Sequence, residues 1–437
     1  MQEEFDLNSA KNSLRGCLIR QIRTQHRLSL ENLAGDTGMN TSILCDMELG
    51  RRRISDQNIQ TILKSVNVDF TLVDDQTVSS LIETILLYFK NFYYMNFDLN
   101  VAIEEQYQKL IDENQECLDD RYFYLLLLGC FITVSYESVV SRTGWEDPDL
   151  DSKLQLLQTA DSYFPAPLDS ISKLICLLHA IEQCDFKRAH SLIGQIQTDY
   201  SDPISCQVTN LVKYQDLRLA NLEGDPPRAY QLIPLVRNEL VKDKNYRRMF
   251  NLDKAEAVYL MTIGNYTQAE QNLSNLQSTL KSLHLTIHRY SILDNRIWCT
   301  LVTRRYEECL DLIEQCESEY SVPSSSNTVF KAYCQYRLDP EADHKLQEEE
   351  LLAFRKRCDD DKNAQKIVDI LFELVKGRKK TFFSKCLSFI HQLIRQQNYP
   401  LAEFFIQAGF DEAESQNQFE MMYQFKKIRL AIEKKSL

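Results

Sequence analysis

The chain has 437 residues, of which 44% are hydrophobic and 26% charged, with only 11 glycines and 10 prolines. This length predicts two or three domains, and the composition favours an all-helical protein with a large apolar core. The formal net charge of −13 excludes a protein whose whole surface binds polyanions nonspecifically.

The stretch from Ser29 to Arg53 predicts a helix-turn-helix. Ser29 can cap a short helix at its N-terminus, and Gly38 permits the turn that follows. Asn40 can then cap a second helix that ends at Gly50. A small helical hairpin with a solvated basic turn is the alternative. Apolar stripes on flanking helices, in residues 14–22 and 59–66, favour a complete small domain instead.

Three arginines follow the second helix directly, at positions 51–53. A helix presented by its N-terminal end, with guanidinium groups just beyond its C-terminus, suits the DNA major groove and its flanking phosphates. Residues 11–64 contain nine Lys or Arg and five Asp or Glu, a balance of +4 that leaves −17 for the rest of the chain. A basic head on an acidic body is expected to concentrate DNA contacts in the head.

Residues 14–70 resemble the lambda-repressor-type (Cro/C1, or XRE) helix-turn-helix domain, through the SLENLA opening at 29–34, the Gly38 turn and MELGR at 47–51. The resemblance implies a structural ion pair between Arg23 and Glu48. It also places base-reading positions in the second of the two helices. The predicted DNA-binding residues are Asn40, Thr41, Ser42, Asp46, Arg51, Arg52 and Arg53.

After this head, predicted at residues 1–70, residues 71–78 have no helical period and are expected to form a linker. A long helix is predicted from Ser79 to about Phe97. The uncharged run Tyr122 to Tyr136 has only fifteen residues, so it predicts a buried helix rather than a membrane span. A break is expected at Gly144 to Pro148.

The middle of the chain contains a repeat in which a turn is followed by a helix with a small residue near its start. The small residues stand 40 positions apart, at Ala189, Ala229, Ala269 and Cys309, and a further copy places Ala402 three residues after Tyr399. These units resemble tetratricopeptide repeats with long helices, and a generic helical bundle is the alternative. The resemblance implies a right-handed α-superhelix over residues 79–361, followed by a C-terminal helical cap and dimerisation region at 362–437.

Stacked helix pairs form a superhelix whose concave face is lined by the first helix of each pair. Projection of the repeat places amide, aromatic, cationic and apolar side chains on that face, a mixture that suits an extended peptide. The predicted peptide-binding residues are Tyr214, Arg218, Asn221, Asn251, Lys254, Asp294 and Trp298.

A helix-turn-helix head joined to a tetratricopeptide-like body resembles, by architecture, the peptide-sensing regulators grouped as the Rap, Rgg, NprR, PlcR and PrgX (RRNPP) family. The resemblance implies a cytoplasmic homodimeric transcription regulator of Gram-positive bacteria that takes part in quorum sensing. It would bind a palindromic operator in double-stranded DNA and a short, reimported signalling peptide. Related proteins imply an alternative, a scaffold that sequesters a response regulator through residues 79–160.

An enzyme ranks last, because the sequence has no Walker loop, GxSxG, HExxH or Gly-rich dinucleotide turn. No catalytic residue, cofactor or metal site is therefore predicted. His284 and His288 are four residues apart, but no carboxylate nearby would complete a metal site. Thirteen cysteines without a CxxC pair are expected to be reduced thiols, and with the absence of a signal peptide they indicate the cytoplasm and no membrane association.

Overall fold

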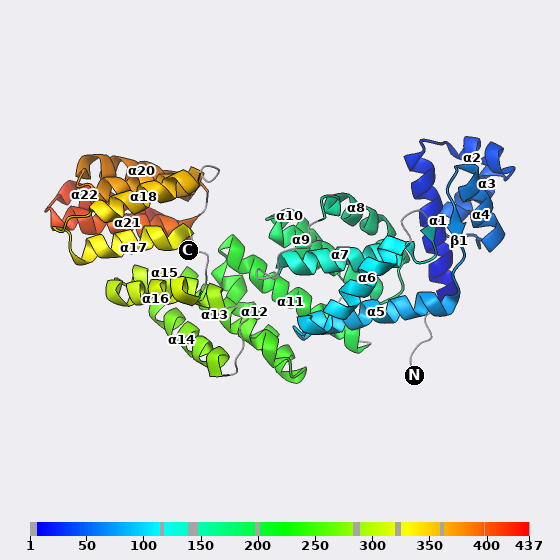
Figure 1. Ribbon diagram of the computed structural model, residues 1–437, viewed down its shortest axis with the longest axis horizontal. Helices are drawn as coiled ribbons and strands as arrows, with labels where there is room; N and C mark the ends of the chain where they lie inside the picture. The colour runs from blue at the N-terminus through cyan, green and yellow to red at the C-terminus, as the bar shows by residue number, and fades with distance from the viewer. Residues whose placement is uncertain are drawn as a thin grey trace. The chain divides into compact units, whose positions relative to one another are not determined.

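The computed structural model describes the chain apart from residues 1–6, 114–117, 139–146, 197–201, 283–288, 320–324, 359–361, 397 and 437. Over the described residues the fold is nearly all-helical, with 22 α-helices, two short 3-10 helices and one pair of two-residue strands (Figure 1). The all-helical prediction is confirmed at this level. None of the described helices is both long and apolar enough to cross a membrane.

The chain divides into two compact units, Met1–Leu252 and Asp253–Leu437. The helices of the first unit are α1 (Leu7–Gln25), α2 (Leu30–Thr37), α3 (Thr41–Glu48), α4 (Asp56–Ser65), α5 (Asp75–Tyr93), α6 (Val101–Glu113), α7 (Tyr122–Ser138), α8 (Leu150–Ala160), α9 (Leu168–Glu182), α10 (Phe186–Gln195), α11 (Pro203–Glu223) and α12 (Pro226–Lys242), with the 3-10 helices η1 (Phe97–Leu99) and η2 (Asp161–Tyr163). The boundary between the units falls inside α13 (Tyr246–Thr262).

The second unit continues with α14 (Tyr266–Ser282), α15 (Arg289–Val302), α16 (Tyr306–Glu319), α17 (Ser325–Leu338), α18 (Lys345–Arg357), α19 (Lys362–Val375), α20 (Lys379–Arg395), α21 (Tyr399–Ser415) and α22 (Phe419–Ser436). Its core is built around aromatic side chains such as Phe382, Phe405 and Phe425, which are fully buried. In the first unit, a single continuous core runs from Leu14 to Leu219 and therefore includes both the N-terminal helices and the helices that follow.

Local capping explains where the helices α2 and α3 begin. The Ser29 hydroxyl accepts a hydrogen bond from the Asn32 amide at 3.1 Å, and the Asn40 side chain accepts one from the Ser42 amide at 2.8 Å. Gly38 ends α2 with φ of +67°, in the left-handed region that favours glycine. Helix α3 ends at Glu48, with Leu49 as its C-cap, rather than at Gly50 as the sequence predicted.

The segment predicted as a linker, residues 71–78, is partly regular. The strand β1 (Phe70–Thr71) pairs in parallel with β2 (Leu118–Asp119). Helix α5 begins at Asp75 rather than at Ser79, because the Asp74 carboxylate caps it by accepting from the Thr77 amide at 2.9 Å. Neither the early start nor the strand pair was predicted from the sequence.

The apolar run at Tyr122 forms α7, and its residues Leu127, Phe131 and Ile132 are fully buried, as predicted for a core helix. The break predicted at Gly144 to Pro148 lies mostly outside the described residues.

The 40-residue repeat coincides with the helix starts. Helices α10, α12, α14 and α16 begin at residues 186, 226, 266 and 306, and the small residue three positions into each helix is fully buried: Ala189, Ala229, Ala269 and Cys309. The turn residues before these helices also recur every 40 positions with positive φ, namely Cys184, Gly224, Gly264 and Arg304. The same buried position appears at Ala402 in α21.

Candidate functional site

The candidate nucleic-acid interface is the N-terminal end of α3 and the segment that follows the helix. Asn40 and Ser42 are exposed, while Thr41 and Asp46 are half-buried. The arginines at 51–53 are all exposed, and in the part of the chain that the structure describes none of their guanidinium groups has an ion-pair partner. The amides of Arg51 and Arg52 both donate to the Asp46 carbonyl, at 2.9 and 3.2 Å, which holds this segment against the end of α3.

Two features of α1 hold α3 in place. The Arg23 guanidinium donates two hydrogen bonds to the Glu48 carboxylate, at 2.6 and 2.9 Å, and a third to the Leu28 carbonyl at 2.8 Å. The hydrogen bond to Glu48 raises the pKa of Arg23. The structure thus brings together the two residues expected to form the ion pair.

The second feature is Gly16 on α1, which the sequence analysis missed. A Cβ atom at this position would lie 2.2 Å from the Met47 carbonyl oxygen, so only glycine lets the backbones of α1 and α3 approach this closely. The local sequence gives no sign of it, because the close approach exists only once the two helices pack.

A second charged cluster fixes the other side of α1 to the rest of the first unit. Arg15 donates to both carboxylate oxygens of Asp120, at 2.6 and 2.8 Å, and to the Ile54 carbonyl at 3.1 Å. The Arg15 and Asp120 side chains are only 6% and 1% exposed. Burial by itself lowers the pKa of Arg15, but the bonds and charges of Asp120 and Asp56 outweigh it, so the pKa is raised.

Further contacts extend this attachment. Lys11 lies 2.7 Å from Asp75, and the Cys17 thiol lies 3.9 Å from the Thr159 carbonyl in α8. Helix α1 therefore packs on α3 with one side and on residues 75–159 with another, while the leading residues of α3 keep their exposure.

The residues predicted to bind peptide fall into both units. Tyr214, Arg218, Asn221 and Asn251 belong to Met1–Leu252, whereas Lys254, Asp294 and Trp298 belong to Asp253–Leu437. The surroundings of the seven residues are therefore described separately for each unit.

In the first unit, Tyr214 and Asn251 are buried, at 6% and 9% exposed. The Arg248 guanidinium lies 5.7 Å from the centre of the Tyr214 ring and donates to the Phe92 and Tyr93 carbonyls at the end of α5. Burial lowers the pKa of Arg248 to about 10. This arginine ties α13 to α5 and covers Tyr214.

Arg218 is half-buried and donates to Glu182 at 2.9 Å and to Gln215 at 3.0 Å. Asn221 is also half-buried. These two side chains are therefore more accessible than the tyrosine one turn before Arg218.

In the second unit, Trp298 packs between Phe330 and Phe404, with ring centres 5.7 and 5.8 Å away. Lys254 lies 3.4 Å from the Ser291 hydroxyl. Asp294 is half-buried, and burial raises its pKa. Trp298 thus belongs to an aromatic cluster at its partly exposed edge, whereas Lys254 and Asp294 provide opposite charges.

Among the described residues, no group of three or more His, Cys, Asp or Glu side chains is arranged to hold a metal ion. His284 and His288 lie outside the described residues. The described cysteines are free thiols. Burial raises the pKa of Cys130 to about 12, so this thiol stays protonated at neutral pH.

Comparison with known proteins gives few matches. No family model and no curated protein matches the chain. Nine chains of solved structures match, among them the apo form of ComR from S. thermophilus, at 16% sequence identity and a TM-score of 0.37. The match covers 62% of this chain and 95% of that chain. A TM-score of 0.37 does not establish a shared fold, so we base the function on the residues of this chain.

Proposed function

We propose that this protein is a peptide-responsive transcription regulator of the RRNPP type, which binds operator DNA as a homodimer through an XRE-type head. The observation that carries the proposal is the N-terminal end of α3 with its exposed Asn40 and Ser42, together with three exposed arginines just after the helix that have no ion-pair partner among the described residues. An exposed helix end with adjacent guanidinium groups can place short side chains on base edges and cations on phosphates.

The roles divide by chemistry. Asn40, Thr41 and Ser42 reach base edges, and Asp46 accepts from a cytosine amino group. Arg51, Arg52 and Arg53 bind phosphates, which supplies affinity without sequence preference. The attachment through Arg15 supports the proposal as well, because a head fixed to the body transmits movements of the body to the DNA-binding helix.

A short peptide bound to the helical hairpins would act through linkage. Two heads in a dimer bind two half-sites only when their separation matches a helical turn of DNA or a multiple of it. A peptide that prefers one arrangement of the body changes this equilibrium by its differential affinity, typically about 1–3 kcal/mol. Within the first unit the accessible candidates for peptide contacts are Arg218 and Asn221, and within the second unit they are Lys254 and Asp294. Tyr214 and Asn251 are buried in the first unit and are weaker candidates.

The DNA-binding proposal is tested with the double substitution R51A/R52A. Fluorescence anisotropy with the duplex upstream of the chain's own coding region, at several salt concentrations, should show weaker binding and a salt slope lower by about 2, one for each lost phosphate contact. The control is K90A, which removes an exposed cation from α5, outside the head. Equal affinity and equal slope for R51A/R52A and the wild type would contradict the proposal.

Peptide binding is tested by calorimetry with the synthetic peptide encoded by the short open reading frame next to the gene. Lys254→Ala should weaken binding about tenfold if its charge contacts the peptide. Lys242→Ala, at a largely exposed lysine of α12, should leave binding unchanged. If the wild type and both lysine variants bind the peptide with equal affinity, Lys254 does not contact the peptide.

The second candidate, a scaffold that sequesters a response regulator, is supported by exposed apolar side chains in residues 79–160. Leu87, Leu99 and Val101 are 51%, 63% and 42% exposed. This candidate predicts that L87A/L99A abolishes capture of the response regulator, while duplex DNA does not bind at low salt. DNA binding that depends on the arginines at 51–53 would rule it out as the main function.

A further inference from the structure

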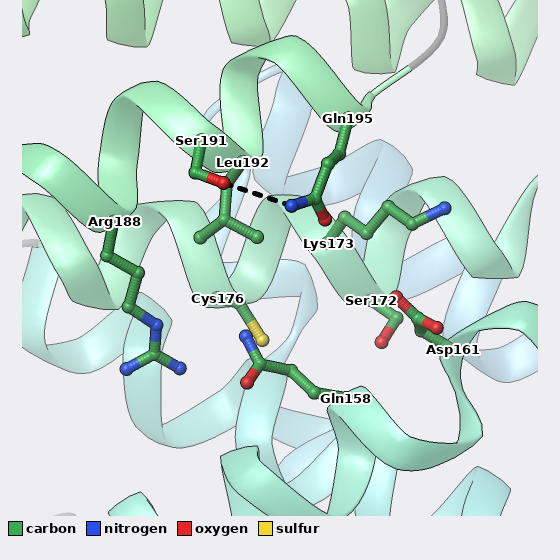
Figure 2. Close-up of a pocket in the computed structure, with 9 residues that line it drawn as sticks. All are labelled: Gln158, Asp161, Ser172, Lys173, Cys176, Arg188, Ser191, Leu192 and Gln195. Carbon is green, nitrogen blue, oxygen red and sulfur yellow. Dashed lines mark hydrogen bonds between the residues drawn. The ribbon is translucent and has the colours of Figure 1, made fainter.

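A polar pocket of about 320 Å³ lies between α8 and η2 on one side and α9 and α10 on the other (Figure 2). It lies in Met1–Leu252 and contains none of the residues predicted for peptide or DNA binding. Small-molecule sites in proteins typically occupy about 300–1,000 Å³. The pocket therefore has room for a compact ligand.

Two opposite charges stand at the ends of the pocket. Figure 2 shows the Arg188 guanidinium at one end and the Asp161 carboxylate at the other. Within the described part of the chain, neither group has a salt-bridge partner. Lys173 also lines the pocket, but its ammonium group has an ion-pair partner, because it lies 3.7 Å from the carboxylate of Asp169, four residues earlier in α9.

The floor of the pocket contains a polar atom without a partner. Ser172 is fully buried, and its hydroxyl makes no hydrogen bond in the structure. A buried hydroxyl without a partner is costly, and a ligand that bonds to it would remove that cost. Cys176 and Leu192 are also buried and provide apolar surface beside the hydroxyl.

The mouth of the pocket is polar and open to solvent. Ser191 and Gln195 are exposed on α10 and are joined by a hydrogen bond of 3.1 Å. A small polar molecule can thus enter from α10, and a small side-chain movement would bring it to the Ser172 hydroxyl, which has no accessible surface of its own.

We propose that this pocket binds a short zwitterion, such as a dipeptide, with its carboxylate on Arg188 and its ammonium group on Asp161. A guanidinium group binds a carboxylate through paired hydrogen bonds. Burial raises the pKa of Asp161, and a ligand ammonium group would offset this by stabilising the ionised carboxylate. Asp161 repels dianions such as phosphate, and an apolar ligand would leave both charges without partners.

The pocket lies close to the contact between the head and the body. Gln158, which lines the pocket, precedes Thr159, and Thr159 contacts Cys17 of α1. Helix α8 and η2 both pack against α1. A ligand in the pocket would therefore touch one side of a helix whose other side supports the head.

The proposal is tested by calorimetry on the full chain with three probes: alanyl-alanine, its N-acetyl form and its C-terminal amide. Alanyl-alanine should bind, and each capped form should bind about tenfold more weakly because one charge-assisted contact is lost. Absence of binding by alanyl-alanine at millimolar concentration, or equal binding of the three probes, would overturn the proposal.

Two variants assign the charges. R188Q should weaken the binding of alanyl-alanine about tenfold and leave the binding of its C-terminal amide unchanged. D161N should weaken the binding of alanyl-alanine and leave the binding of the N-acetyl form unchanged. K187Q, at the exposed lysine beside Arg188, is the matched control and should bind like the wild type. Equal effects of R188Q and K187Q, or tighter binding of inorganic phosphate than of alanyl-alanine, would also overturn the proposal.

Discussion

The contacts of α1 and the repeated positions of the helical hairpins use different chemistry, although both lie against an apolar core. Buried charges fix α1 to its neighbours, through Arg15 with Asp120 and Arg23 with Glu48. The hairpins pack through small buried residues, represented in the first unit by Ala189 and Ala229. Bidentate ion pairs require one orientation of the two partners, whereas a small apolar residue only allows two helices to approach.

This difference bears on how the protein could work. A head fixed by directional ion pairs has one orientation on its support, as a DNA-binding element needs for correct half-site geometry. The small residues of the hairpins instead set how closely the neighbouring helices approach. The buried charged contacts of α1 are expected to be individually strong, and the contact at each small residue of the hairpins individually weaker.

The largest effect is expected for Asp120→Ala. The substitution leaves the buried Arg15 with only the exposed Asp56 as a charged partner, and breaking a buried pair in this way costs about 3–5 kcal/mol. Urea unfolding measures the loss. Asp75→Ala, which removes the 62% exposed partner of Lys11, is the control and should cost less than about 1 kcal/mol. Similar losses for both variants would mean that the Arg15 cluster does not fix the head.

Glu48→Gln should cost about 2 kcal/mol, because Glu48 is buried but the Arg23 side chain is 17% exposed, and the amide keeps one hydrogen-bond acceptor. DNA binding should weaken together with stability, since α3 loses its hold on α1. Glu31→Gln changes an exposed carboxylate in α2 and should change neither quantity. If Glu48→Gln has the same free energy of unfolding as the wild type, the ion pair contributes nothing to the stability of the head.

Ala229→Leu tests the hairpins and should cost about 1–3 kcal/mol through overpacking. Ala229 is fully buried in the core and has no accessible surface, so three more carbon atoms must displace its surroundings. Leu235→Ala in the same helix, at 52% exposed, should change the free energy of unfolding by less than about 0.5 kcal/mol. A neutral Ala229→Leu would show that the repeated small residue is not needed for packing.

The smallest effect, about 1 kcal/mol, is expected for Asn40→Ala, which removes the N-cap of α3. Hydrogen exchange of the amides in α3 should detect it as local opening, with little change in global unfolding. Asn40→Asp keeps the cap and should restore protection. Equal exchange in Asn40→Ala and the wild type would contradict a role for the cap.

Local signals in the sequence predicted much of the fold. Ser29, Gly38 and Asn40 lie at the caps and the turn to which they were assigned, because capping depends on residues within one turn of the helix. The small residues of the repeat are buried near the helix starts, because a 40-residue period preserves the same local pattern in each copy. The helix-turn-helix identity of the head, its DNA contacts and the peptide site remain predictions.

By itself, the sequence determined where α2, α3 and the four repeat helices begin, and that the small residue of each repeat faces the core, because these features depend on neighbours in the chain. Only the tertiary structure decided that Arg15 meets Asp120, 105 positions away, that Gly16 lies against Met47, and that Arg248 covers Tyr214. It also brought Arg188 and Asp161 to one pocket from different elements. Such contacts depend on how distant helices pack, and a periodic pattern contains no information about which charged residue finds which partner.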